Sequence, residues 1–145
     1  MQREELKNKI IEVINQSKLG SVATIKDGKP WVRYMVLQHD ENLTLYTATF
    51  AGSRKVEEIN KNNNVHITVG GDPKDLQMAF VNIQAAAQVL TDTETKKKYW
   101  SDMLKIYFSG PEDPNYAVIK IFPEIVEYTA PGAHQPEVYQ VNDKR

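Results

Sequence analysis

The sequence predicts one mainly β (α+β) domain, an antiparallel barrel of six strands with three peripheral helices. Short segments rich in Val, Ile, Thr and Tyr alternate with turn signals. The first three are joined by connections too short for parallel crossovers, so neighbouring strands must be antiparallel. A chain of 145 residues suits one domain, expected at residues 1–130. Residues 131–145 contain two prolines and little periodicity, so this tail is expected to pack loosely or to cross onto a partner subunit.

The chain begins with a predicted helix and a predicted hairpin. Residues 3–17 carry apolar side chains every three or four positions, which is the pattern of an amphipathic helix. A strand is expected at 21–25, and Asp27-Gly28 then favours the type I′ turn of a β-hairpin. The apolar run at 31–39 predicts a central strand with both faces covered.

A second hairpin and a short helix are predicted next. Strands at 31–39 and 43–49 flank a polar loop centred on Asp40, as a hairpin with a four-residue loop requires. After the glycine turn at Gly52, a helix is expected to run to about Asn60, where a series of asparagines favours a turn.

Three more strands and one more helix are predicted in the second half of the chain. The strands are expected at 65–69, 76–90 and 116–128, and the helix at about 94–107. The alanines within 76–90 would also suit a helix. Pro123 cannot donate a hydrogen bond to a neighbouring strand, so an edge, a bulge or a bend is expected there.

Composition excludes several classes of function. The 18 basic and 19 acidic residues give a net charge of −1, which argues against nucleic acid as the main partner. The absence of cysteine excludes disulfides, thiolate metal sites and a Cys nucleophile, and the three histidines lack zinc-binding spacings, so no metal site is predicted. The charged N-terminus resembles no signal peptide, and no apolar run approaches the ~20 residues that span a bilayer. No membrane partner and a cytoplasmic location are therefore expected.

One group of residues indicates an anion-binding site. Thr49 ends a predicted strand, a glycine-containing turn follows, and Ser53, Arg54 and Lys55 stand at the start of a predicted helix. Backbone N–H groups at a helix N-terminus, together with hydroxyls and cations, suit a phosphate. Arg33 is either a strand-end residue with its guanidinium in solvent or a further cation that reaches the same anion.

Several motifs follow one another in a recognisable order. They are Gly20-Ser21-Val22-Ala23-Thr24, Asp27-Gly28-Lys29-Pro30, Arg33, Leu45-Tyr46-Thr47-Ala48-Thr49, Ser53-Arg54-Lys55, Asn60-Lys61-Asn62-Asn63, Tyr107-Phe108-Ser109-Gly110-Pro111 and Ile125-Val126-Glu127-Tyr128. In this order and spacing the chain resembles the FMN-binding split-barrel proteins related to pyridoxamine 5′-phosphate oxidase, and among them the general stress protein branch. The resemblance covers the chain from the leading helix to about Tyr128.

The resemblance implies a homodimer of split β-barrels, with an FMN in each of two clefts between the subunits. The backbone near Met35 and Val36 would lie along the isoalloxazine ring, and Gln77 would contact the flavin from its own or the partner subunit. The implied cofactor-binding residues are Arg33, Thr49, Ser53, Arg54 and Lys55 for the phosphate, and Met35, Val36, Gln38 and Gln77 for the rest of the flavin.

The resemblance also limits the expected reaction. Pyridoxamine phosphate oxidases carry a C-terminal Arg-Leu-His-Asp-Arg segment that holds the substrate phosphate, and the tail from Pro131 to Pro136 has no such segment. We therefore expect an FMN-dependent oxidoreductase or flavin reductase that uses a small-molecule electron donor or acceptor. No residue identifies itself as catalytic. The alternative is a stress protein that binds or senses flavin without turnover; a nucleic-acid-binding barrel is a weaker third hypothesis.

Overall fold

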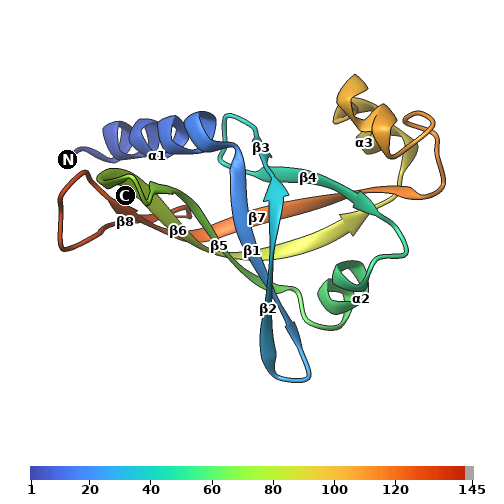
Figure 1. Cartoon of the computed structure of the whole chain (residues 1–145), viewed down its shortest axis with the longest axis horizontal. Coiled ribbons are helices and arrows are strands. Elements are labelled where there is room, and N and C mark those ends of the chain that lie inside the picture. The colour runs from blue at the N-terminus through green and yellow to red at the C-terminus, as the bar shows by residue number, and fades with distance from the viewer. Residues whose placement is uncertain (143–145) are drawn as a thin grey trace.

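The computed structural model describes residues 1–142, which form one antiparallel sheet of eight strands flanked by helices (Figure 1). The predicted mainly β class is confirmed, with eight strands in place of six. The strands are β1 (Leu19–Lys26), β2 (Lys29–Val36), β3 (Gln38–His39), β4 (Leu45–Phe50), β5 (Asn64–Asp72), β6 (Asp75–Leu90), β7 (Tyr116–Thr129) and β8 (Glu137–Gln140). The helices are α1 (Arg3–Ser17), α2 (Arg54–Lys61), α3 (Thr93–Lys98) and the 3₁₀ helix η1 (Asp102–Ile106).

The strand order curls the sheet back on itself. The order is β2-β1-β5-β6-β7-β4-β3, and β8 pairs with β7 outside this path. Because β2 and β3 stand at opposite ends of that order and are separated in the chain by Leu37 alone, the two ends of the sheet must approach each other. The sheet therefore curls into a barrel, whose interior is filled by buried aliphatic residues such as Ile67, Ile83 and Ile121.

The first helix closes one end of the core. Its apolar face, which includes Ile10 and Val13, is buried against the sheet. Gly70 of β5 permits this close packing, because it has a positive φ of 94° and a Cβ there would lie 2.7 Å from the carbonyl oxygen of Ala79 and 2.8 Å from a methyl group of Val13. No helix within residues 1–142 is long and apolar enough to cross a membrane.

The predicted Asp27-Gly28 turn forms, with φ of 52° and 75°.

The predicted strand at 31–39 is wrong in two respects. The strand that follows stops at Val36, and only the two-residue β3 pairs with β4. Moreover, β2 is the end strand of the sheet, and Val32 and Tyr34 are 64% and 77% exposed, so its outward face is uncovered. An apolar run marks either a covered strand or a strand whose outer face is an exposed apolar surface, and here it marks the second.

The predicted helix at 94–107 is divided into α3 and η1. Asp92 caps α3 by accepting a hydrogen bond from the Thr95 amide, and the helix ends before Trp100. The Ser101 hydroxyl then accepts a bond from the Met103 amide at 3.4 Å, which starts the separate 3₁₀ turn. A second capping residue therefore interrupts an otherwise continuous apolar stripe.

The last part of the sheet contains a bulge and an unpredicted strand. The ladder between β6 and β7 shifts register at Ala85, which stands opposite Pro123, as the proline predicts. Beyond residue 130, the segment β8 pairs with β7 and buries Tyr139. Arg3 of α1 donates hydrogen bonds to the carbonyls of Gln140 and Val141 at 2.7 and 3.1 Å. The expectation that the whole tail packs loosely does not describe β8.

Candidate functional site

Three of the predicted site residues meet where β4 ends and α2 begins. The Lys55 ammonium donates to the Thr49 hydroxyl at 3.0 Å, and the Thr49 and Ser53 hydroxyl oxygens lie 3.3 Å apart. We call Thr49, Ser53 and Lys55 the anion cluster. Ser53 is the N-cap residue of α2, yet its hydroxyl makes no capping hydrogen bond to that helix. Two hydroxyls and a cation therefore lie together at the N-terminal end of α2, which is the end of a helix that favours an anion.

Arg33 lies close to the anion cluster, and hydrogen bonds to residues of β1, β2 and α2 hold its guanidinium in place. Its Nη1 donates to the Thr24 hydroxyl at 2.7 Å and to the Trp31 carbonyl at 2.9 Å, and its Nη2 donates to Glu58 at 3.0 Å. The side chain is 20% exposed. Arg33 is thus not a strand-end residue with its guanidinium free in solvent, and it is near enough to Lys55 for their positive charges to repel.

Glu58 is the part of this site that sequence reasoning missed. It lies on α2, which packs against β1 and β6, and it is 4% exposed. Its Oε1 accepts hydrogen bonds from Thr24 at 2.5 Å and from Arg33 at 3.0 Å. Its Oε2 lies 3.0 Å from Nε of Arg54 as an ion pair but has no hydrogen-bond donor within residues 1–142.

These contacts shift the pKa values of Glu58 and Lys55. Burial alone would raise the pKa of Glu58, but the hydrogen bonds from Thr24 and Arg33 and the charges of Arg33 and Arg54 outweigh it and hold that pKa below its usual value. Burial, and then repulsion by Arg33, lowers the pKa of Lys55, and Glu58 offsets part of this shift. A half-buried cation repelled by a second cation is a place where an anion is favoured.

Acid is expected to weaken the fold through Glu58. Its lowered pKa means that Glu58 contributes stability that is fully present above about pH 4.5 and is lost as the pH falls through the lowered value. Glu58→Gln should therefore flatten the fall in the free energy of unfolding below that pH, measured by urea titrations at a series of pH values. Glu57→Gln, at an exposed carboxylate paired with Lys61, is the control. Equal pH dependence in wild type and Glu58→Gln would contradict the expectation.

Arg54 shields the outer side of the site. Its guanidinium carbon lies 4.5 Å from the centre of the Trp31 ring while its Nε pairs with Glu58. This stacking holds Arg54 over the start of β2, and more than half of its side chain stays exposed. The structure therefore brings Arg33, Arg54 and the anion cluster together.

The remaining predicted residues lie outside this cluster within the chain. Met35 is buried in the core, whereas Val36 and Gln38 are exposed. Across the sheet, Arg33 is aligned with Ile83 of β6 through the paired strands β1 and β5. Gln77 lies six residues before Ile83 on β6, and six residues of a strand span roughly 20 Å. Gln77 therefore does not join Arg33 within one subunit.

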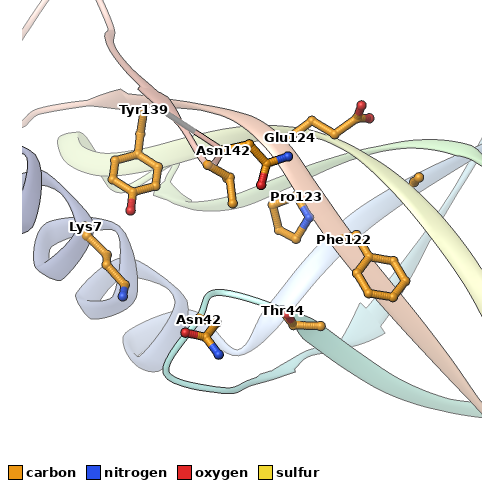
Figure 2. Close-up of a pocket in the computed structure, with 10 residues that line it drawn as sticks. Lys7, Asn42, Thr44, Phe122, Pro123, Glu124, Tyr139 and Asn142 are labelled. Atoms are coloured by element: carbon orange, nitrogen blue, oxygen red, sulfur yellow. The ribbon is translucent and has the colours of Figure 1, made fainter. Parts of the chain in front are cut away.

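A separate cleft lies at the other side of the molecule. Figure 2 shows it between α1, the loop after β3 and the C-terminal segment, and its volume is about 600 Å³. None of the predicted site residues lines it. Its lining consists of Lys7, Asn42, Thr44, Ala86, Phe122, Pro123, Glu124, Tyr139, Val141 and Asn142. No group of three His, Asp or Glu side chains suited to a metal ion is found within residues 1–142.

Comparison with known proteins identifies the family. The family model described as Pyridoxamine 5′-phosphate oxidase matches residues 6–130. The chain belongs to the pyridoxamine 5′-phosphate oxidase family. This membership confirms the resemblance inferred from the motifs, and the family's split barrel agrees with the curled sheet described above, whose end strands β2 and β3 are not paired with each other.

Two relatives of this family member are general stress proteins. The chain is 38% identical over 136 residues to General stress protein 26 of Bacillus subtilis, which covers 94% of this chain and 96% of the relative. The crystal structure of General Stress Protein 26 from Bacillus anthracis is 32% identical, with a TM-score of 0.80 over 94% of this chain and 98% of that one. A FAD-binding protein from Mesorhizobium loti shares the fold alone, at 18% identity and a TM-score of 0.66 over 83% and 89% of the two chains.

Proposed function

We propose that the protein binds FMN and serves as an oxidoreductase or flavin reductase related to, but distinct from, pyridoxamine 5′-phosphate oxidase. The observation that carries the proposal is the anion cluster at the start of α2, where the Ser53 hydroxyl is not used as a cap and Lys55 stands 3.0 Å from Thr49. A phosphate monoester, with a charge of about −1.5 to −2 and three acceptor oxygens, fits this set of donors.

The residues have separate tasks in this proposal. The anion cluster and Arg33 bind the FMN phosphate, and Arg54 adds charge from the rim. The backbone at Met35 and Val36, near the end of the edge strand β2, borders the ring, together with Gln38. The flavin supplies the electron chemistry when bound, so the protein contributes binding, orientation and exclusion of water.

The proposal includes a homodimer with the cofactor between subunits. The outward face of β2 carries Val32, Tyr34 and Val36, all more than 60% exposed. Three such residues in alternate positions of an edge strand form an apolar surface that a second copy can cover. Gln77, which is too far from Arg33 within one chain, would then approach the flavin bound mainly by the partner.

Lys55→Ala is expected to weaken FMN binding about 10- to 100-fold, since a charge-assisted hydrogen bond contributes about 1.5–3 kcal/mol. Riboflavin, which lacks the phosphate, should bind wild type and variant equally. The measurement is a titration of the apoprotein that follows flavin fluorescence. Lys61→Ala, at the exposed far end of the same helix, is the control and should bind FMN as wild type does. Wild-type protein that remains free of flavin absorbance after soaking in FMN and desalting would reject the proposal.

A second candidate function is a stress protein that binds flavin without turnover. The similarity to General stress protein 26 favours it. So does the pairing of Arg33 and Arg54 with Glu58, because these ion-paired groups are not suited to act as a general acid or base in a reaction. The two candidates differ in one measurement. Bound FMN that is reduced by NADH or NADPH and reoxidised by an added acceptor supports the oxidoreductase; flavin that stays oxidised under both supports the binding protein.

A further inference from the structure

Thr24 and Glu58 accept hydrogen bonds from the Nη1–Nη2 end of the Arg33 guanidinium. Arginine has five N–H bonds in a fixed plane. The two on Nη1 are directed to the Thr24 hydroxyl and the Trp31 carbonyl, with the Val22 carbonyl a longer contact at 3.4 Å, and one on Nη2 is directed to Glu58. Thr24 and Glu58 are themselves joined by a hydrogen bond of 2.5 Å, so they form a single acceptor surface under the Nη1–Nη2 end.

The opposite edge of Arg33 remains available. Within residues 1–142 no acceptor takes a hydrogen bond from Nε of Arg33 or a second one from Nη2. These two N–H groups are parallel and lie on the same side of the guanidinium, which is the arrangement that binds two oxygens of one phosphate or carboxylate. An arginine with one end fixed thus retains its bidentate edge.

We propose that Glu58 is a positioning residue that fixes Arg33 so that its Nε–Nη2 edge meets the phosphate of the bound cofactor. This inference rests on the proposed function, because it concerns the same site. Glu58 does not touch the ligand; it acts through Arg33 and, by its ion pair 3.0 Å from Nε, through Arg54. Being 4% exposed and held on both sides, the carboxylate keeps both arginines in place before the ligand arrives.

The charge of Glu58 also matches the site to a doubly charged ligand. Arg33, Arg54 and Lys55 bring three positive charges close together, and Glu58 neutralises one of them. The two charges that remain balance a phosphate monoester, which carries about −1.5 to −2 at neutral pH. Glu58 therefore limits the repulsion among the cations in the free protein without consuming the edge of Arg33 that binds.

The test compares the dissociation constants of FMN and riboflavin in Glu58→Ala and Glu58→Gln. Their ratio reports the phosphate contribution alone. In Glu58→Ala the advantage of FMN over riboflavin should fall about tenfold or more, because Arg33, which has lost the acceptor of Nη2 and is held through Nη1 alone, must be ordered on binding. In Glu58→Gln the amide oxygen can still accept from Thr24 and Arg33, so the advantage should fall by no more than about threefold. The lost negative charge acts in the opposite direction, because three cations then face the phosphate. Thr24→Val, which removes the side-chain acceptor of Nη1 and the hydroxyl that donates to Glu58, should resemble Glu58→Ala and replaces it if that variant does not fold.

Several outcomes would overturn the inference. An unchanged ratio in Glu58→Ala or Thr24→Val, or equal weakening of FMN and riboflavin, would show a purely structural role for Glu58. Tighter FMN binding in Glu58→Ala would show that Glu58 competes with the ligand for Arg33. Inorganic phosphate provides a second test that does not depend on flavin. The measurement is the rise in Tm that phosphate causes. If wild type binds no FMN but phosphate raises its Tm and Glu58→Ala loses that rise, the proposed function fails and the inference stands; if phosphate has no effect either, both fail.

Discussion

Val32→Glu is expected to convert the proposed dimer into a monomer and to weaken FMN binding more than tenfold. Val32 is 64% exposed on the outward face of β2, beside Tyr34 and Val36. A carboxylate placed there would be desolvated without a partner when the second copy covers the strand, and an uncompensated buried charge costs several kcal/mol, roughly 3–5. The fold itself should be unaffected, because the side chain lies in solvent within one subunit.

The measurement is light scattering coupled to gel filtration, followed by the FMN titration. Val138→Glu, at a comparably exposed valine of β8, is the matched control and should leave both the mass and the affinity unchanged. A wild-type protein that elutes as a monomer at micromolar concentration would reject the dimer. A monomeric variant with unchanged FMN affinity would show instead that one subunit holds the whole cofactor site.

Tyr116→Ala is expected to lower the free energy of unfolding by about 3–5 kcal/mol, and Tm by roughly 10 °C. Tyr116 is fully buried at the start of β7, where its ring packs against Trp100 and Phe108 with centroids 5.5 and 5.2 Å away. Its removal would leave a cavity in the second, aromatic core that holds α3 and η1 on the sheet.

Tyr116→Phe separates packing from hydrogen bonding. The Tyr116 hydroxyl donates to the carbonyl of Lys96 at 3.0 Å, so its loss alone should cost about 1 kcal/mol. Denaturant titrations of the two variants measure both effects. A cost below 1 kcal/mol for Tyr116→Ala would indicate that this region unfolds independently of the barrel.

Local patterns were sufficient for the parts of the fold that depend on neighbours in the chain. The helix α1, the Asp27-Gly28 turn and the long strand β6 follow from periodicity and turn chemistry within a few residues. The meeting of Thr49, Ser53 and Lys55 is equally local, since one turn separates a strand end from a helix start. The proximity of these three side chains therefore follows from the sequence, and their binding of an anion stays a prediction.

The errors arise where tertiary contacts decide. The apolar run before His39 looks alike whether its second face meets a helix, a neighbouring strand or another subunit, and so β2 was wrongly predicted to be covered on both faces. In β8, the only buried side chain is Tyr139, which is too little for a strand pattern. Besides its pairing with β7, β8 is bound at its end by hydrogen bonds from Arg3, which lies at the other end of the chain.

Glu58 shows the same limit at the site. A glutamate four positions after Arg54 on a short helix reads as half of a solvent-exposed ion pair. Its burial arises because α2 packs on β1, where Thr24 and Arg33 supply donors from strands some 25 to 34 residues earlier in the chain. No pattern within α2 contains that information.

Because Arg54 stacks on Trp31, the intrinsic fluorescence of Trp31 can report on the site without an added label. The chain has two tryptophans, and Trp100 lies in the aromatic core with Tyr116, away from α2. In a Trp100→Phe background, the emission of Trp31 alone would report on a guanidinium 4.5 Å above its ring. Movement of Arg54 toward an anion, and energy transfer from the indole to a nearby flavin, would both appear in that single signal and could be followed on the time scale of binding.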